Sequence, residues 1–368
     1  MVGTIPYVNL RAQWEGDREE LLPIIESVLA SGNYVGGEEV ELFEKDIASF
    51  CDTKYAVALN SGTDALVCAL SSVGVGPDDE VITPPNSFIA STAAIVHLGA
   101  IPVFADVGED QNIDPSNIEK IITKKTKAIM PVHLTGRVCD MDAIMEIASY
   151  HKIPVIEDSA QSVGSKYNDR LSGSIGEVGC FSAHPLKNLN ACGDSGFLTT
   201  NSPEIAEKAR LARSHGLSDR NTVRFFGHVS RMDCLQAAIL RFRLSKINEV
   251  IRLRRRNAEI YRNILRSDRL VCPEETQKEF NTWHTFVIQT KKRDQLRKHL
   301  VSKNIETAIH YPIPIHLQPA CKRFGYSQGD FPVCERQSTQ ILTLPVHQFL
   351  SAEQIATVAN EINKFFGS

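Results

Sequence analysis

The sequence predicts an α/β protein with a mainly parallel central sheet, and three observations support that prediction. Between about residues 55 and 200, short runs rich in β-branched residues alternate with segments of helical periodicity. Apolar strands that alternate with helices are typical of a parallel sheet covered by helices on both faces. With 368 residues, the chain is also long enough to bury a large core and a smaller second one.

Seven apolar runs are predicted as strands of this sheet. They are Tyr55–Leu59, Glu80–Thr83, Pro102–Ala105, Ala128–Val132, Val155–Glu157, Gly179–Ser182 and Phe197–Thr200. Four segments between them have helical character, namely Thr63–Ser72, Phe88–His97, Pro115–Ile122 and Met141–His151. Ligands of such sheets bind beyond the carboxyl ends of the strands, so a site is expected where these strands end.

Helical patterns also flank the predicted sheet. Apolar residues recur at helical spacing over Leu21–Leu29, and Gly32 follows as a helix breaker. After the sheet, Arg231 to about Leu265 predicts one long helix or a kinked pair. A strand-like Thr285–Gln289 and a helical Ser351–Phe366 then predict a smaller α+β unit.

We therefore expect two domains. A large α/β domain, including the N-terminal helical segment, would span residues 1–250, and a small C-terminal domain would span residues 251–368.

Composition excludes several classes of function. A net charge of −4 and a pI near 6.3 argue against a nucleic-acid-binding surface. The start of the sequence lacks the pattern of a secretory signal, and no apolar stretch is long enough to cross a bilayer. The nine cysteines are scattered and form no Cys-x-x-Cys pair. We expect reduced thiols, no metal site and a cytoplasmic location.

Lys187 stands between an apolar strand-like run and a turn that contains Gly193. Burial of an ammonium group lowers its pKa, and a neutral amine attacks a carbonyl to form a Schiff base. A solvated loop lysine would explain the same local pattern, so Lys187 alone does not decide between the two interpretations.

Asp158 follows an apolar strand-like run at a position where α/β sheets bind ligands. One interpretation is that its side chain caps the next helix. The other is that it pairs with a cationic ring nitrogen, as a pyridoxal phosphate cofactor requires. The residue alone leaves both open.

The turn Ser61-Gly62-Thr63 follows one strand and opens a helix, where exposed N–H groups and the helix dipole bind phosphate. Ser182 is a candidate for a further phosphate ligand. Phe88 lies at the next strand-to-helix junction, where an aromatic ring either stacks on a flat cofactor or packs in the core.

Four sequence motifs together resemble a known family. They are Ser61-Gly62-Thr63-x-Ala65-Leu66, Glu157-Asp158-x-Ala160-Gln161, Phe181-Ser182-x-x-Pro185-x-Lys187-x-Leu189 and Arg231-Met232-Asp233-x-x-Gln236-Ala237-Ala238. The chain resembles the DegT/DnrJ/EryC1/StrS family of pyridoxal-phosphate-dependent sugar aminotransferases. The resemblance extends from Gly32-x-Tyr34-x-x-Gly37 to Leu344-Pro345-x-His347, nearly the full length.

The resemblance implies a fold-type-I aminotransferase that forms a homodimer with shared active sites. It implies that Lys187 forms the Schiff base with the cofactor and that Asp158 pairs with the pyridine nitrogen. By the same resemblance, Gln161 lies near the ring hydroxyl and Phe88 stacks on the ring. The implied phosphate cradle consists of Ser61, Gly62, Thr63 and Ser182.

The implied reaction moves an amino group from L-glutamate to C3 or C4 of a nucleotide-linked keto-sugar, for surface glycans or secondary metabolites. Candidate contacts for the sugar or the nucleotide are His184, Arg231, His310, Tyr311 and His316. Each of them is also explained as an ordinary polar loop residue. The loop from His310 to His316 offers no further paired ligand at metal-binding spacing.

One departure from the family concerns the cofactor phosphate. Many members carry an Asn that reaches across the dimer to the phosphate, and here that position is Val229, which cannot donate this bond. His228 or Ser230 could replace it, or one subunit could hold the phosphate alone. A milder departure is Ser195 in Gly193-Asp194-Ser195-Gly196.

Two alternatives to an aminotransferase remain at this point. Sugar dehydratases on the same scaffold carry a histidine in place of the lysine, so Lys187 argues against that activity. A non-catalytic regulatory homologue would tolerate the loss of Lys187 or Asp158, and the chain retains both.

Overall fold

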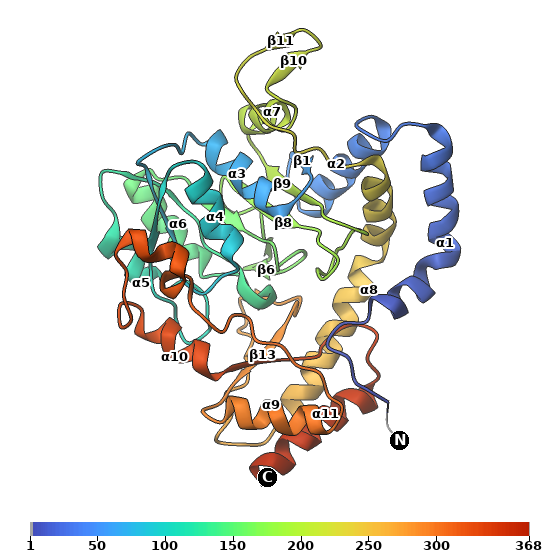
Figure 1. Ribbon diagram of the computed structural model, residues 1–368, viewed down its shortest axis with the longest axis vertical. Coiled ribbons are helices and arrows are strands. Elements are labelled where there is room, and N and C mark those ends of the chain that lie inside the picture. Colours follow the sequence, from blue (N-terminus) through green and yellow to red (C-terminus); the bar gives the residue numbers. More distant parts are fainter. Residues whose placement is uncertain (1–2, 368) are drawn as a thin grey trace.

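The computed structural model describes residues 3–367, and seven strands build its central sheet in the order β3-β2-β4-β5-β8-β9-β1 (Figure 1). These strands are β1 (Tyr55–Leu59), β2 (Glu80–Thr83), β3 (Ile101–Phe104), β4 (Thr126–Ile129), β5 (Ile156–Asp158), β8 (Val178–Ser182) and β9 (Gly196–Thr200). Parallel bridges Ile129–Val155 and Val132–Asp158 connect β4 to β5. Strand β9 runs antiparallel to both neighbours, and the other six are mutually parallel. The predicted mainly parallel sheet is confirmed.

Helices pack around this sheet and continue beyond it (Figure 1). They are α1 (Leu10–Ser31), α2 (Glu38–Phe50), α3 (Gly62–Ser72), α4 (Ile89–His97), α5 (Pro115–Ile118), α6 (Met141–His151), α7 (Pro203–Ala212), α8 (Cys234–Ile264), α9 (Arg293–Ser302), α10 (Pro332–Gln340) and α11 (Ala352–Phe366). The segment from Arg231 to Leu265 therefore forms one helix, α8. The helix predicted over Pro115–Ile122 is shorter, because the chain tightens to a 3₁₀ turn at Glu119–Ile121.

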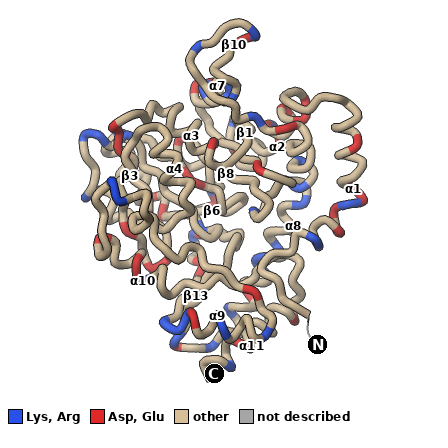
Figure 2. The backbone as a smooth tube through the Cα atoms, in the orientation of Figure 1, with Lys and Arg blue, Asp and Glu red and all other residues tan. Residues whose placement is uncertain are grey.

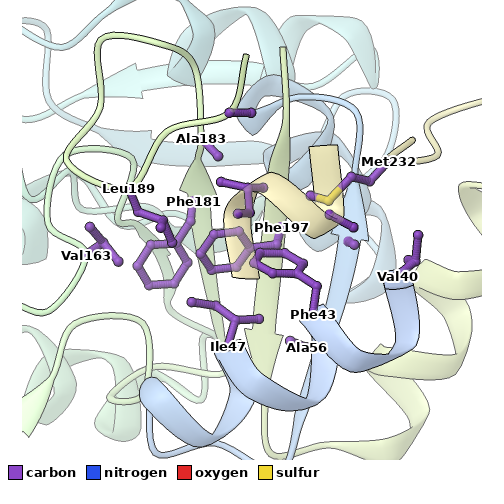
Figure 3. Close-up of a cluster of buried hydrophobic side chains, with 14 of the residues drawn as sticks. Val40, Phe43, Ile47, Ala56, Val163, Phe181, Ala183, Leu189, Phe197 and Met232 are labelled. Carbon is purple, nitrogen blue, oxygen red and sulfur yellow. The ribbon is translucent and has the colours of Figure 1, made fainter. Parts of the chain in front are cut away.

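Three phenylalanines attach α2 to the strands that carry the candidate lysine loop (Figure 3). The rings of Phe181 on β8 and Phe197 on β9 are stacked with centroids 4.7 Å apart. Phe43 of α2 meets Phe197 edge to face at 5.7 Å. Such pairs stabilise a core beyond the area that they bury. Since Ser182 directly follows Phe181, this packing fixes the carboxyl end of β8, from which the Lys187 loop departs.

A second core lies at the C-terminal end of the chain. There β13 (Phe286–Gln289) pairs antiparallel with β14 (Ile341–Leu344), and α8, α9 and α11 pack beside the pair. Ile5 also belongs to this core and forms a bridge with Ile305. Helix α8 packs in both cores and runs without a break through residue 250. The division into residues 1–250 and 251–368 stays a prediction.

Two smaller sheets complete the fold. The first consists of β6 (Lys166–Tyr167), β7 (Arg170–Leu171) and β12 (Glu279–Phe280). The second is a hairpin of β10 (Leu217–Asp219) and β11 (Thr222–Val223), which protrudes from the molecule at the top of Figure 1.

Basic and acidic residues are intermixed along the backbone in the view of Figure 2. Within residues 3–367, no helix is long and apolar enough to cross a membrane. The same residues contain no group of three or more His, Cys, Asp or Glu side chains arranged to hold a metal ion.

Candidate active site

A cavity of about 360 Å³ opens where β5 and β8 end, between the central sheet and the C-terminal core. All eight residues predicted to bind the cofactor line it. They are Ser61, Gly62, Thr63, Phe88, Asp158, Gln161, Ser182 and Lys187. The sheet topology explains the convergence, because the carboxyl ends of parallel strands meet at one edge.

Lys187 lies in the loop between β8 and β9, and its backbone N–H closes a turn by donating to the carbonyl of His184 at 2.8 Å. Its side chain is half-buried and lines the cavity. Burial lowers the pKa of Lys187 to about 8, and the nearby Asp158 carboxylate opposes this shift. A larger fraction of the amine is therefore neutral near pH 7 than for an exposed lysine.

Asp158 ends β5 and is 4% exposed. Its Oδ2 accepts a hydrogen bond from the Ser91 hydroxyl at 2.7 Å, and its Oδ1 accepts one from the Ala160 N–H at 3.2 Å. Burial raises the pKa of Asp158, while these two hydrogen bonds and the more distant Lys187 lower it. A net upward shift means that the buried carboxylate lacks sufficient positive charge, which a cationic ring nitrogen would supply.

A fully buried network lies directly behind Asp158. The Glu157 carboxylate accepts backbone N–H bonds from Gly173, Ile175 and Gly176 at 2.7–2.8 Å. The ring of His133 lies 2.9 Å from Glu157 through Nε2. Because Nδ1 of His133 accepts the N–H of Cys139, Nε2 carries the proton and donates it to Glu157. The backbone N–H of His133 also bonds the carbonyl of Asp158, so the network holds β5 in place.

The N-terminus of α3 forms a compact cradle beside Lys187. Ser61 caps the helix by accepting the Asp64 N–H at 3.1 Å, and the first N–H groups of a helix lack partners within it. A Cβ added to Gly62 would lie 2.7 Å from the Cβ of Ser182. One added to Gly196 would lie 2.4 Å from the backbone nitrogen of Gly62. Glycine is thus required for the approach of α3, β8 and β9, which places hydroxyls and N–H groups around a space suited to phosphate.

Gln161 and Phe88 border the same space. The Oε1 of Gln161 accepts the Thr135 N–H at 2.8 Å, and its side chain also interacts with the Tyr311 hydroxyl. Phe88 is 54% exposed, and its ring centroid lies 5.7 Å from that of Tyr311. This exposure argues against the core interpretation of Phe88. Together with Asp158 and the cradle, the residues present fit a flat phosphorylated pyridine aldehyde.

Of the predicted substrate contacts, His184, His310 and Tyr311 line the cavity. Burial lowers the pKa of His310 to about 4 and raises the pKa of Tyr311 to about 12, so both are neutral near pH 7. Arg231 is exposed and does not line the cavity. His316 is 1% exposed and bonds Glu335 at 3.0 Å, so it too lies outside the cavity. The structure therefore brings three of the five together.

The residues around Val229 do not reach the cavity of their own chain. Val229 is 49% exposed. Ser230 donates to Asn60 Oδ1 at 3.0 Å and accepts the Asn60 N–H, which occupies its hydroxyl. The His228 ring lies 3.8 Å from the sulfur of Cys68. Neither His228 nor Ser230 is placed to replace the asparagine toward the phosphate cradle of the same chain.

Sequence reasoning missed several residues that line the cavity, including Tyr7, Ser91, Arg254, His284 and His347. A signal for Arg254 is present in the pattern of α8. Helical spacing places Arg254 on the same face as Ile247, Ile251 and Ala258, all of which are buried. An arginine on an apolar helix face is exceptional and indicates a partner or a ligand.

Known proteins resemble this chain over nearly its whole length. The DegT/DnrJ/EryC1/StrS aminotransferase family matches residues 16–363. A "Pleiotropic regulatory protein" of Geobacillus stearothermophilus is 38% identical over 98% of each chain. A "dTDP-3-amino-3,4,6-trideoxy-alpha-D-glucose transaminase" of Streptomyces venezuelae is 39% identical, covering 98% of this chain and 96% of that protein.

Among solved structures, DesV of S. venezuelae in complex with a ketimine intermediate superposes with a TM-score of 0.97. The identity is 38%, and 99% of each chain is covered. These likenesses confirm the predicted fold class, the aminotransferase activity and pyridoxal phosphate as the cofactor. The chain belongs to the DegT/DnrJ/EryC1/StrS aminotransferase family.

Proposed function

We propose that this aminotransferase moves an amino group from L-glutamate to a nucleotide-linked keto-sugar, in amino-sugar biosynthesis for surface glycans or secondary metabolites. The observation that carries the proposal is the convergence of Lys187, Asp158 and the α3 cradle on one cavity. The transaminase from S. venezuelae is named for a sugar aminated at C3, which makes C3 the first position to test.

Each residue has a role that follows from its surroundings. The cradle of Ser61, Gly62, Thr63 and Ser182 would hold the cofactor phosphate. Phe88 would cover one face of the ring, and the amide nitrogen of Gln161 would donate to the ring hydroxyl. When bound, pyridoxal phosphate supplies an aldehyde that accepts nitrogen and a ring that delocalises the electron pair of the donor Cα.

Asp158 and Lys187 would perform the proton chemistry. The buried carboxylate of Asp158, fixed by Ser91 and Ala160, would keep the ring nitrogen protonated. The Lys187 amine, with its lowered pKa, would accept the proton from the donor Cα and deliver it to the aldehyde carbon of the cofactor. In the second half of the reaction, Lys187 would move the proton in the opposite direction, to the keto-sugar carbon that receives the nitrogen, and Asp158 would keep its role.

The two half-reactions test this function separately. Protein loaded with pyridoxal phosphate is mixed with L-glutamate, and 2-oxoglutarate is measured together with loss of the aldehyde absorbance. Aminated protein is then mixed with candidate nucleotide keto-sugars, and return of the aldehyde absorbance identifies the acceptor. Lys187→Ala is the control, and we expect neither half-reaction in it. A wild-type protein that forms no 2-oxoglutarate from glutamate would refute the proposed donor.

A regulatory role is the second candidate, because the relative from G. stearothermophilus is named as a regulatory protein. The glutamate half-reaction distinguishes the two, since a non-catalytic regulator has no need of turnover. The dehydratase alternative predicts no 2-oxoglutarate and loss of water from the sugar instead.

We further propose a cytoplasmic homodimer with shared active sites. The hairpin β10–β11 and the segment after it expose Val223, Phe225, Phe226 and Val229. A cluster of exposed apolar side chains on a projecting element is typical of a surface that a second subunit covers. Sedimentation of the wild type and of Phe226→Ser would test the assembly, with weaker dimerisation expected for the variant.

A further inference from the structure

Two arginines of α8, Arg243 and Arg254, are the buried arginines of the described chain, at 9% and 7% exposure. The two guanidinium groups differ in whether a carboxylate lies beside them. Arg243 bonds the Asp17 carboxylate at 3.2 Å and donates to the backbone of Asn190. For Arg254, no carboxylate among residues 3–367 lies within 4.0 Å. A buried charge without an acid partner is costly, so a structure that retains one indicates a ligand of opposite charge.

The guanidinium of Arg254 is held by neutral acceptors on two of its three nitrogens. Nε donates to the side-chain oxygen of Gln348 at 3.2 Å. Nη1 donates to the carbonyls of Trp283 and His284 at 3.3 and 3.1 Å. Nη2 has no acceptor among the described residues, although arginine can donate both of its N–H groups. Because Arg254 lines the cavity, these two donors are available to a molecule bound there.

The surroundings of Arg254 make this end of the cavity positive. Tyr7, His284 and His347 line the cavity close enough to Arg254 to respond to its charge. His310 and Lys187 line the same cavity. Burial lowers the pKa of His310 and His347 to about 4, lowers the pKa of His284 well below its usual value, and raises the pKa of Tyr7. All four are therefore neutral near pH 7. Desolvation also lowers the pKa of Arg254 to about 10, which still leaves it charged.

We propose that Arg254 binds a carboxylate of the amino-acid donor through Nη2 and so selects the donor of this aminotransferase. The inference rests on the proposed function. Its position favours the donor over the nucleotide, because Arg254 bonds the carbonyl of His284, whose ring is close enough to Lys187 to respond to its charge. The donor's α-carboxylate is attached to the reacting carbon, whereas a sugar ring separates the nucleotide phosphates from the keto carbon.

Variants on α8 give a matched test. Arg254→Gln removes the charge, Arg254→Lys retains it without the second nitrogen, and Arg252→Gln is the control. Arg252 lies on the same helix, is 63% exposed and pairs with Glu249. Gln348→Glu leaves Arg254 in place and supplies it with an internal carboxylate, which would compete with the carboxylate of the ligand.

Binding is measured first by calorimetric titration of the cofactor-loaded enzyme with glutarate, a dicarboxylate that cannot react. The half-saturation and limiting rate for L-glutamate are then measured in the first half-reaction, and those for the keto-sugar in the second. Arg254→Gln should weaken binding of glutarate and glutamate by roughly 10- to 100-fold, from the loss of charge-assisted hydrogen bonds. The limiting rate and the sugar half-saturation should stay within about twofold, as should every value for Arg252→Gln.

Arg254→Lys should recover part of the lost affinity for glutarate and glutamate. Gln348→Glu should weaken the binding of glutarate, and this result does not depend on whether Arg254→Gln folds. Unchanged affinity for both glutarate and glutamate in a folded Arg254→Gln would overturn the proposal. A rise in sugar half-saturation alone would also overturn it, and would assign Arg254 to the nucleotide phosphates. A wild-type enzyme that does not react with glutamate would instead refute the proposed function.

Discussion

Lys187 should reduce the stability of the cofactor-free protein in a way that depends on pH. Burial places its pKa at about 8, against 10.5 for an exposed lysine. That difference corresponds to about 3 kcal/mol, since each pKa unit is worth about 1.4 kcal/mol. Below pH 8 the folded protein must keep a buried ammonium, and the whole penalty applies.

The sign follows from the protons bound in each state. Between pH 8 and 10.5 the unfolded chain keeps the proton on Lys187 while the folded chain has lost it. Stability therefore rises with pH across this window, relative to a variant without the amine. Above pH 10.5 both states are neutral at this position and the penalty vanishes.

The perturbation is Lys187→Met, which keeps most of the side-chain volume and removes the titrating group. Urea unfolding of wild type and variant is measured from pH 7.5 to 10.5, and only the difference between their free energies of unfolding is used. Effects of all other groups cancel in that difference. We expect the variant to be more stable at pH 7.5 by up to about 3 kcal/mol beyond their difference at pH 10.5. A difference that does not change with pH would refute the buried, partly neutral amine.

Three further predictions concern the groups around Lys187. Ser91→Ala removes the 2.7 Å hydrogen bond to Asp158 and should weaken cofactor binding about tenfold, as measured by absorbance titration. An unchanged dissociation constant for the cofactor would contradict the role of Ser91 in fixing Asp158. Glu157→Gln places an amide NH₂ group against backbone N–H donors, so it should lower the free energy of unfolding in urea by about 2–4 kcal/mol. Near-wild-type stability would contradict the role of this buried network. Gly62→Ala places a Cβ 2.7 Å from the Cβ of Ser182, so it should lower the free energy of unfolding by about 1–3 kcal/mol and weaken cofactor binding, whereas Gly76→Ala, whose added Cβ meets nothing within 4 Å, is the control and should change neither.

The sequence was sufficient for the sheet because its strands are short, β-branched and separated by helices. The antiparallel direction of β9 could not be predicted from the sequence, since an apolar run such as Phe197–Thr200 suits a parallel and an antiparallel strand equally well. Several strand ends lie a few residues from their predicted positions, because an apolar run does not mark the residue at which strand pairing stops. The residues that we propose to bind the cofactor could be singled out from the sequence because each stands within a local motif at or after the carboxyl end of a strand.

The substrate side of the cavity was much less predictable. Arg231 and His316 were polar residues of loops, and their direction depends on tertiary packing that no local pattern contains. His316 turns inward to Glu335, and Arg231 turns outward. Arg254 comes from the middle of α8 and reaches the cavity only because the helix crosses between the two cores. Its apolar helix face was the single available signal.

The most direct test of the active site is to locate the covalent attachment of the cofactor. Wild-type protein is loaded with pyridoxal phosphate, reduced with borohydride, digested and analysed by mass spectrometry. We predict the reduced cofactor on the peptide that contains Lys187 and no labelled peptide from Lys187→Ala. Attachment to a different lysine in the wild type, or full labelling of Lys187→Ala, would contradict the assignment of this cavity as the site of transamination.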